Sequence, residues 1–514
     1  MKTQSEPTIA VLDFGSQYSH LIVRRIREQG VHAELLPPDV SAKNLAQYRG
    51  IILSGGPQNL SASDALRVDK EVFTMGVPVL GICYGLQLMA YELGGTVGAG
   101  NSREYGRATV SVSGDSPLFK GLEKNQQTWM SHGDHVTAVP DGFTVSGESK
   151  TCPVAAMENT ALQLYGIQFH PEVVHTPEGN TIIKNFLELT GAPHTWNLGE
   201  TWIDEAVETI RAQAPDGRAV CALSGGVDST VAAYLVHRAI GERLTCIYVD
   251  TGLMRLGETE QIKKTFAAIP NLDFRVVEAE QVFLSKLDGV TDPEQKRKII
   301  GGLFIDLFEE EAKKLGDVKW LVQGTLYTDA ISSGVSVGGT AANIKSHHNV
   351  GGLPERLPFK LIEPLRDLYK DEVRKIGAML GVPESIVTRQ PFPGPGLAVR
   401  IIGAVSKDKL EMLRHADAIL REELERDGHH KDIQQYLAAL PDIRSVGVQG
   451  DARTYGHPII IRAVTTQDFM TADWARIPYE VLAEISNRIT NEVHGVNRVV
   501  YDITSKPPGT VEWE

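Results

Sequence analysis

The chain has 514 residues, enough for about two to four domains, and its 42% hydrophobic and 23% charged residues are ordinary for a globular protein. A net charge of −14 argues against a surface for nucleic acid or anionic membranes, because those partners require basic stripes. Four cysteines without a CxxC pair give little support to a zinc site, a redox dithiol or a disulfide scaffold, and favour a reducing compartment.

The N-terminal segment MKTQSEPTIAVLDFG lacks the charged region and long apolar core of a signal peptide. The most apolar run extends from Val77 to Tyr91 and is interrupted by Gly81, Gly85 and Gln87. It is too short to span a bilayer. We therefore expect a cytoplasmic protein.

Apolar strands and amphipathic helices alternate through the first part of the chain. Strands are predicted at 8–14, 50–57 and 77–85, and a helix at 18–30 ends at Gly30, a good C-terminal cap residue. This alternation predicts a largely parallel sheet. The turn-rich stretch 188–200 follows, and we place the end of a first domain, 1–192, within it.

A second alternating region predicts a second doubly wound domain, 193–390. Its predicted strands are 218–223, 244–249, 274–279 and 319–323, and its predicted helices are 228–240, 258–268, 296–315 and 369–380. The segment RQPFPGPGLAVR marks the next boundary with three prolines and two glycines.

The remaining residues, 391–514, predict a small α+β domain. Helices are expected at 407–427 and 478–493, and strands near 444–449, 458–464 and 497–503. The whole chain is thus expected to be an α/β protein with two doubly wound, mainly parallel sheet domains and a small α+β C-terminal domain.

The segment GICYG places Cys83 between a predicted strand and a predicted helix, with Gly81 and Gly85 on either side. A sharp strand-to-helix turn needs small neighbours and lifts a nucleophile clear of the sheet. The following helix points its N-terminus at Cys83 and favours the thiolate. A lone cysteine without such neighbours is more often a buried, inert core residue. Backbone N–H groups of the glycine loop 53–57 and of Tyr84 are candidates for binding a developing oxyanion.

A base for this nucleophile occurs in YGIQFHPEVVHT, where His170 ends an apolar strand and Glu172 follows two residues later. A carboxylate in that place can orient the imidazole and stabilise its charged form, as the third member of a triad does. We expect His132 to be structural and near the mouth of the same pocket. We expect His135 and His175 to be solvent or turn histidines.

The motifs LSGGP, GICYG, SHGD and YGIQFHPE together resemble the class I, triad glutamine amidotransferases over residues 8–190. The resemblance implies a flavodoxin-like glutaminase domain, in which Cys83 attacks the side-chain amide of glutamine. It further implies that His170 protonates the leaving ammonia and that water hydrolyses the glutamyl thioester. Gly56 and Tyr84 would bind the oxyanion, and Gln87 would help to seat the glutamine.

The segment SGGVDS follows the apolar strand RAVCAL, precedes a helix, and predicts a phosphate-binding loop. Its glycines let successive backbone N–H groups converge on one anion, and the helix dipole complements negative charge. Asp228 is a candidate Mg²⁺ ligand, because that ion prefers carboxylate and phosphate oxygens. A kinase-type loop would carry a lysine. The missing lysine favours pyrophosphate as the leaving group, so that the substrate is adenylated. The candidate ATP-binding residues are Ser224, Gly225, Gly226, Val227, Asp228, Ser229 and Thr230.

The full motif resembles the N-type ATP pyrophosphatases, whose fold is Rossmann-like. Five further stretches, together with the C-terminal GVNRVVYDITSKPPGTVEWE, are similar to the family of glutamine-hydrolysing GMP synthetases; they lie at 250–258, 292–305, 322–334, 344–355 and 361–377. The resemblance spans essentially the whole chain. One departure is Thr328, where the family more often has proline in a loop, and we expect it to alter little.

This resemblance implies that ATP adenylates the C2 oxygen of xanthosine 5′-monophosphate (XMP), and that ammonia then displaces AMP to give GMP. Mg²⁺ would accompany ATP, and the third domain would form a homodimer. The XMP-binding residues would be Arg297, Gln449, Lys506 and Glu512, with Lys345, His347 and His348 as weaker candidates. For Arg297 the competing interpretation is a solvated helix face, which is usual for charge runs such as KRK.

Three other functions were weighed. A non-catalytic regulatory protein would be expected to have lost Cys83, His170 or the loop serines. A tRNA-thiolating enzyme would need a basic RNA surface and a sulfur-carrying cysteine, but Cys221 lies inside an apolar strand and the chain is acidic. A CTP synthetase-like enzyme would share the glutaminase but require a lysine-bearing phosphate loop. All three rank below the GMP synthetase interpretation.

Overall fold

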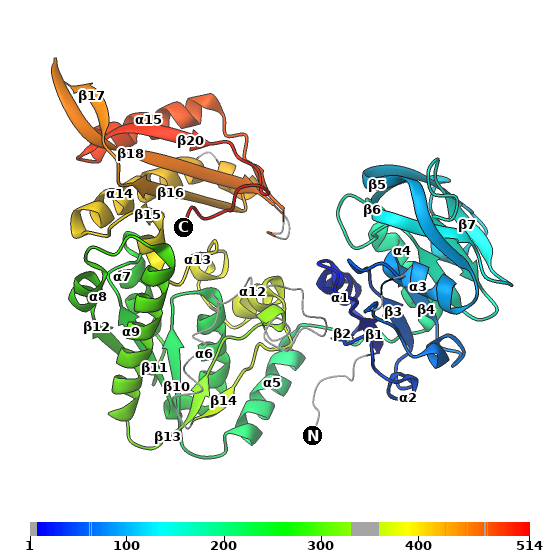
Figure 1. Ribbon diagram of the computed structural model, residues 1–514. Helices are drawn as coiled ribbons and strands as arrows, with labels where there is room; N and C mark the ends of the chain where they lie inside the picture. Colours follow the sequence, from blue (N-terminus) through cyan, green and yellow to red (C-terminus); the bar gives the residue numbers. More distant parts are fainter. Residues whose placement is uncertain are drawn as a thin grey trace. The chain divides into compact units, whose positions relative to one another are not determined.

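A computed structural model describes residues 8–60, 62, 64–329, 359–426, 428–449, 451–466, 469 and 471–514. Within these residues the chain forms two compact units, an N-terminal unit that ends at Leu198 and a C-terminal unit that begins at Gly199 (Figure 1). No helix in the described ranges is both long and apolar enough to cross a membrane.

The N-terminal unit is built on a nine-stranded sheet in the order β2-β1-β3-β4-β9-β8-β7-β5-β6. Its strands are β1 Ile9–Leu12, β2 Ala33–Leu36, β3 Gly50–Leu53, β4 Val79–Ile82, β5 Thr96–Val112, β6 Asn125–Ala138, β7 Thr144–Glu148, β8 Ala156–Asn159 and β9 Leu164–Ile167. Its helices are α1 Ser19–Glu28, α2 Ala42–Leu45, α3 Tyr84–Glu92 and α4 Gly179–Thr190. The predicted strands and the predicted helix of this unit are all confirmed.

Only half of this sheet is parallel. Strands β2, β1, β3, β4 and β9 pair in parallel, and β1, β3, β4 and β9 are buried along their whole length, as parallel strands covered on both faces are. Strands β8, β7, β5 and β6 continue the sheet in antiparallel pairs. The expectation of a mainly parallel first sheet is therefore wrong for these four strands. Strand β6 alternates buried and exposed residues, which is typical of an antiparallel strand with one solvated face.

The C-terminal unit begins with a five-stranded, fully parallel sheet in the order β12-β11-β10-β13-β14. Its strands are β10 Arg218–Leu223, β11 Leu244–Asp250, β12 Asp273–Glu278, β13 Val318–Val322 and β14 Lys360–Ile362. The helices of this part are α5 Glu200–Gln213, α6 Val227–Ile240, α7 Glu258–Ala267, α8 Glu280–Leu287, α9 Pro293–Lys313, α12 Lys370–Met379 and α13 Glu384–Val387. The doubly wound prediction holds here, and the four predicted strands and four predicted helices are present.

A second sheet lies toward the end of the same unit, in the order β15-β16-β18-β17, with β19 and β20 also paired to β18. Its strands are β15 Ile401–Ile402, β16 Gln435–Pro441, β17 Ser445–Gln449, β18 Ala452–Thr465, β19 Asp473–Trp474 and β20 Val496–Asp502. Helices α14 Lys407–Arg426 and α15 Tyr479–Glu492 pack against it. This α+β arrangement agrees with the prediction.

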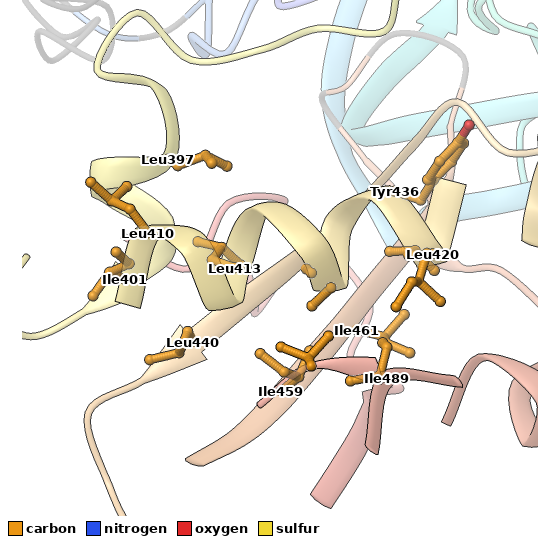
Figure 2. Close-up of a cluster of buried hydrophobic side chains, with 14 of the residues drawn as sticks. Leu397, Ile401, Leu410, Leu413, Leu420, Tyr436, Leu440, Ile459, Ile461 and Ile489 are labelled. Atoms are coloured by element: carbon orange, nitrogen blue, oxygen red, sulfur yellow. The ribbon is translucent and has the colours of Figure 1, made fainter. Parts of the chain in front are cut away.

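One buried apolar cluster joins the two sheets of the C-terminal unit. Figure 2 shows Leu410, Leu413 and Leu420 of α14 above Ile459 and Ile461 of β18. The same cluster includes buried side chains of α8 and α9, which belong to the first half of the unit. The predicted boundary at 390 therefore falls inside a single compact unit, whereas the predicted boundary at 192 lies six residues before the observed division.

Candidate active sites

Cys83 occupies a strained turn between β4 and α3. Its backbone has φ 54° and ψ −104°, a region that non-glycine residues rarely adopt. A Cβ at Gly81 would lie 2.6 Å from the carbonyl of Gly85, and a Cβ at Gly85 would lie 2.3 Å from the carbonyl oxygen of Leu53. Both glycines are therefore required for the strand and helix to approach closely enough to form the turn.

His170 and Glu172 follow the end of β9 and form a buried pair. Nδ1 of His170 lies 2.7 Å from Oε1 of Glu172, and the two side chains are 4% and 0% exposed. The other carboxylate oxygen of Glu172 is buried and has no hydrogen-bond partner among the described residues, so His170 is its observed charge partner. Burial opposes the charged imidazole, but the Glu172 carboxylate and the hydrogen bond with Cys83 outweigh it and raise the pKa of His170 to about 10.

Two glutamine side chains complete the surroundings of the sulfur. Nε2 of Gln168 donates to Sγ of Cys83 at 3.5 Å, and Nε2 of Gln87 lies 3.2 Å from Oε1 of Gln168 and donates to the Asp134 carbonyl at 2.8 Å. Gln87 thus supports Gln168. Gln168 was missed from the sequence, although it stands two residues before His170, the spacing that places extended residues on one face.

The candidate oxyanion donors lie beside this turn. Within the described part of the chain, the N–H groups of Gly56 and Tyr84 donate to no protein acceptor. A Cβ at Gly56 would lie 2.7 Å from the Phe14 carbonyl oxygen, so only glycine fits there. The Tyr84 side chain has a structural place, because its ring packs on Phe14 and its hydroxyl donates to the Leu66 carbonyl. Its backbone N–H remains available to a ligand.

The remaining histidines of the first motifs are structural in geometry. His132 is buried, with Nδ1 3.1 Å from the Asp134 carbonyl oxygen and Nε2 3.1 Å from Glu104. His135 is buried on β6, so the expectation of a solvent or turn histidine is wrong for it, because β6 was not predicted as a strand. His175 is half-buried and its ring lies on Trp129.

The SGGVDS loop connects β10 to α6. Gly225 has φ +74° and Gly226 is the N-cap of α6, so the first N–H groups of the helix have no intrahelical acceptor. Its hydroxyls bond within the loop: Oγ of Ser224 lies 3.2 Å from Oγ of Ser229, and Thr230 donates to the Gly226 carbonyl at 2.8 Å. The loop therefore presents free backbone donors and hydroxyls that a phosphate can recruit.

Lys370, the first residue of α12, supplies a positive charge that the loop itself lacks. Its Nζ lies 2.5 Å from Oδ2 of Asp228. Within the part of the chain that the structure describes, the other carboxylate oxygen of Asp228 is buried and has no hydrogen-bond partner. Such an oxygen beside a phosphate loop suits Mg²⁺. Lys370 was missed because it follows Asp228 by 142 residues and no local motif marks it.

The 224–230 loop is also positioned by Arg389 and by a close backbone contact at Gly324. Arg389 donates to the Gly225 carbonyl and pairs with Glu258 at 2.7 Å. A Cβ at Gly324 would lie 2.9 Å from the backbone of Asp228, so the segment after β13 must have glycine there. Thr328, expected in a loop, lies in a helical turn at 327–329, where the proline of the family pattern is also tolerated.

The C-terminal tail is held by buried cations. The fully buried guanidinium of Arg400 donates to both carboxylate oxygens of Glu512, at 3.0 and 2.9 Å. Lys296, also fully buried, lies 2.5 Å from Oε2 of Glu514 and donates to the Ile401 carbonyl at 2.6 Å. The KRK run is therefore not a uniformly solvated face.

The candidate XMP residues each have their own surroundings. Arg297 is partly exposed and pairs with Glu294 at 3.5 Å, and Lys506 donates to the Phe469 carbonyl at 2.5 Å. Among the described residues, no hydrogen bond or ion pair joins Arg297, Lys506 and Glu512 to one another. Gln449 ends β17. Lys345, His347 and His348 lie outside the described residues.

Comparisons with known proteins show which family the chain resembles. Residues 10–189 match the family model described as glutamine amidotransferase class-I, and residues 422–513 match the model described as GMP synthase C terminal domain. The chain is 57% identical to the glutamine-hydrolysing GMP synthase of Geobacillus kaustophilus, over 99% of this chain and 100% of the relative. It is 56% identical to that of Halothermothrix orenii with the same coverage, and 54% identical to that of Bacillus anthracis over the whole of both chains.

Proposed function

The chain belongs to the glutamine-hydrolysing GMP synthases and makes GMP with glutamine as the nitrogen donor, and from this premise we propose how its residues divide the reaction. Glutamine is hydrolysed at the turn that carries Cys83, and ATP is used at the SGGVDS loop. The observation that carries this proposal is the presence, in one chain, of a buried Cys83–His170–Glu172 arrangement and a phosphate loop without its own lysine.

In the first reaction, Sγ of Cys83 attacks the carboxamide carbon of glutamine. The Gly56 and Tyr84 N–H groups stabilise the oxyanion, and protonated His170 donates its proton to the leaving ammonia. Water then attacks the thioester while His170, now neutral, takes up one of its protons. The Cys83 thiolate leaves, His170 is protonated again, and the product carboxylic acid loses its proton to solvent as glutamate. Gln87 acts through Gln168, which holds the sulfur in place.

In the second reaction, the C2 oxygen of XMP attacks the α-phosphorus of ATP, and pyrophosphate leaves. The backbone N–H groups and hydroxyls of residues 224–230 hold the leaving pyrophosphate, and Lys370 adds the charge that the loop lacks. Asp228 would hold Mg²⁺ through its unpaired oxygen, and that ion would neutralise the phosphate charge. Ammonia then attacks C2 of the adenylated base, and AMP leaves.

For XMP itself we retain Arg297, Gln449, Lys506 and Glu512 as the proposed contacts. Two of these residues, Lys506 and Glu512, lie in the C-terminal tail. Bonds from Arg400 to Glu512 and from Lys296 to Glu514 fold this tail onto the C-terminal unit and support the proposal for them. Glu512 is already engaged, so its part in XMP binding would be to fix the tail or to exchange Arg400 for the ligand.

We also propose a cytoplasmic homodimer with the three domains 1–192, 193–390 and 391–514. All four cysteines are free thiols, as expected in a reducing compartment. The hairpin of β17 and β18 extends beyond the rest of its sheet (Figure 1), and its Val446, Val448 and Tyr455 are 51%, 74% and 61% exposed. Such apolar exposure is typical of an interface. Light scattering should give twice the chain mass, and Val448→Asp should reduce it to one chain; a wild-type monomer would contradict the dimer.

An isotope experiment tests whether XMP is adenylated or phosphorylated at the 224–230 loop. XMP labelled with ¹⁸O at C2 is converted with Mg·ATP and glutamine, and the products are analysed by mass spectrometry. Adenylation transfers the label into the phosphate of AMP. Label in inorganic phosphate, with ADP as the coproduct, would show phosphorylation instead and would overturn the proposed use of the loop.

A further inference from the structure

Three potential metal ligands meet in the N-terminal unit outside the arrangement of Cys83, His170 and Glu172. Glu104 on β5 and His132 on β6 are direct cross-strand partners, and Cys152 follows β7. One ligand atom from each lies within 4.8 Å of the other two. Cys152 and His132 are buried, and the Glu104 side chain is 10% exposed.

The segment that carries Cys152 is fixed by its own hydrogen bonds. Oγ of Ser149 accepts from the Cys152 N–H at 2.9 Å, and the Ser149 N–H donates to the Cys152 carbonyl at 2.9 Å. The same hydroxyl donates to Oε1 of Glu104 at 3.4 Å. Strands β5 and β6 and the hydrogen-bonded segment after β7 therefore bring an oxygen, a nitrogen and a sulfur ligand together.

The contacts of His132 are compatible with a role as metal ligand. Both ring nitrogens face oxygen atoms that can only accept, the Asp134 carbonyl at 3.1 Å and the Glu104 carboxylate at 3.1 Å. A neutral imidazole has a single N–H. If Nδ1–H donates to the Asp134 carbonyl, Nε2 faces the carboxylate with a lone pair. A histidine that donates to a backbone carbonyl from one nitrogen and binds metal through the other is the usual arrangement in metal sites.

We propose that Glu104, His132 and Cys152 bind one divalent transition metal ion, with Zn²⁺ as the best fit. Zn²⁺ takes carboxylate, imidazole and thiolate together, whereas Mg²⁺ and Ca²⁺ take oxygen ligands. Three protein ligands leave a fourth position for water or another ligand. The Nε2–Oε2 separation of 3.1 Å is short enough for both atoms to coordinate a single ion.

Binding requires the loss of one proton. A metal binds the thiolate form of cysteine, so the Cys152 thiol loses its proton on binding. The metal–sulfur bond replaces the S–H bond, and the proton passes to solvent, so that one proton is released for each ion bound. Affinity should accordingly rise with pH.

The site would act on the wall of the glutaminase site. Ser131, the residue before His132 on β6, directs its carbonyl oxygen toward Sγ of Cys83 at 3.8 Å. An ion that binds β5, β6 and the Cys152 segment together would fix this carbonyl. We therefore expect metal to stabilise the N-terminal unit, independently of the proposed function.

Cobalt spectroscopy of the full-length protein tests the site, because Co²⁺ reports thiolate ligation through a sulfur-to-metal charge-transfer band. Protein stripped of metal with a chelator is titrated with Co²⁺ and then with Zn²⁺. We expect the band to saturate at about one equivalent, with about one proton released, and Zn²⁺ to abolish it. Cys152→Ser should remove the band, and Glu104→Gln and His132→Gln should weaken Co²⁺ binding by at least about 100-fold.

Two controls separate this site from the other buried thiols. Cys83 and its neighbours are another set of groups that could bind Co²⁺ through a thiolate. If the metal binds at Cys152 instead, Cys83→Ser should keep the band, and Cys246→Ser should keep it as well. Should His132→Gln fail to fold, the near-isosteric Cys152→Ser still decides the matter, together with a Zn²⁺-dependent rise in Tm that wild type shows and Cys152→Ser lacks. A band that persists in Cys152→Ser, or disappears in Cys83→Ser, would overturn the proposal. So would the absence of any band in wild type.

Discussion

The turn that carries Cys83 and the loop that carries Asp228 both connect a buried parallel strand to a helix, but their polar groups are arranged differently. At Cys83 the reacting groups are buried and already bonded to one another, with His170 2.7 Å from Glu172. In the 224–230 loop, Ser224 is exposed and the hydroxyls bond to other atoms of the loop. Lys370 pairs with one oxygen of Asp228, and the other oxygen has no hydrogen-bond partner among the residues that the structure describes.

The difference reflects what each site must stabilise. A cysteine nucleophile needs its charge partner in place before glutamine arrives, and burial strengthens that pairing. A loop for ATP must exchange its internal bonds for bonds to phosphate, so it remains partly open. Substitutions at the first site should therefore affect one nitrogen source, and substitutions at the second should affect both.

The largest effect is expected from Glu172→Gln. The amide keeps the shape but removes the charge that holds His170 protonated, so glutamine-dependent GMP formation should fall by roughly 10³- to 10⁴-fold. Ammonium-dependent formation should stay within about twofold. Initial rates with each nitrogen source measure this, with the exposed Glu178→Gln as the matched control. An equally large loss of ammonium-dependent GMP formation would show that the substitution does not act on glutamine hydrolysis alone.

The same substitution should change the pH dependence. The pKa of His170 is raised to about 10 in the folded protein from the ordinary histidine value of about 6.5. The protonated form therefore stabilises the N-terminal unit fully below pH 6.5, and this contribution is lost as pH rises through 10. Without the Glu172 charge, the basic limb of kcat/KM for glutamine should move to lower pH. An unchanged limb would mean that another group controls it.

Asp228→Asn should reduce both glutamine- and ammonium-dependent synthesis, by about 10²- to 10³-fold. The carboxylate that faces Lys370 and the candidate Mg²⁺ position loses its charge. Asp204→Asn, an exposed aspartate on α5, is the control. AMP release with each nitrogen source is the measurement, and a deficit confined to glutamine would contradict the assignment of this loop to ATP.

Lys370→Met is expected to have a smaller effect on the same site. Removing one positive charge from a phosphate site should raise KM for ATP by about 10- to 100-fold, with less effect on KM for XMP. Lys375→Met, on the exposed face of the same helix, should leave both constants unchanged. Equal KM values for ATP in the two variants would remove Lys370 from the site.

Glu512→Gln tests how the C-terminal tail is held, a segment outside the Cys83 turn and the 224–230 loop. Arg400 is fully buried and would keep Asp417, 3.6 Å away, as an ion-pair partner. The free energy of unfolding should fall by about 2–4 kcal/mol in urea, since a buried charge loses its hydrogen-bonded carboxylate. The exposed Glu480→Gln is the control. Weaker XMP binding without any loss of stability would instead support direct contact with the nucleotide.

Local sequence patterns predicted most of the elements and the residues around Cys83. Continuous apolar runs such as IAVL and VLGI are buried strands, and the glycines that flank Cys83 permit the close approach seen there. The antiparallel strand β6, which includes the SHGD motif, was not predicted, because its alternating polar residues leave no continuous apolar run.

Local sequence patterns could not predict contacts between residues that only tertiary folding brings together. Lys370 reaches Asp228 across 142 residues, and Arg400 reaches Glu512 across 112. Nothing near either residue in the sequence marks its partner. The buried Lys296 shows the same limit, since a charge run on a helix normally faces solvent and here one lysine points into the core.

The most direct test of the two-site account compares Cys83→Ala with wild type, with XMP, Mg·ATP and either glutamine or ammonium. The account predicts that the variant forms GMP and AMP in equal amounts at near wild-type rates with ammonium, and forms no GMP with glutamine. If Cys83→Ala used glutamine as well as wild type does, the nitrogen would not come through Cys83. If wild type made no AMP from XMP, the assignment of the 224–230 loop to XMP adenylation would be contradicted.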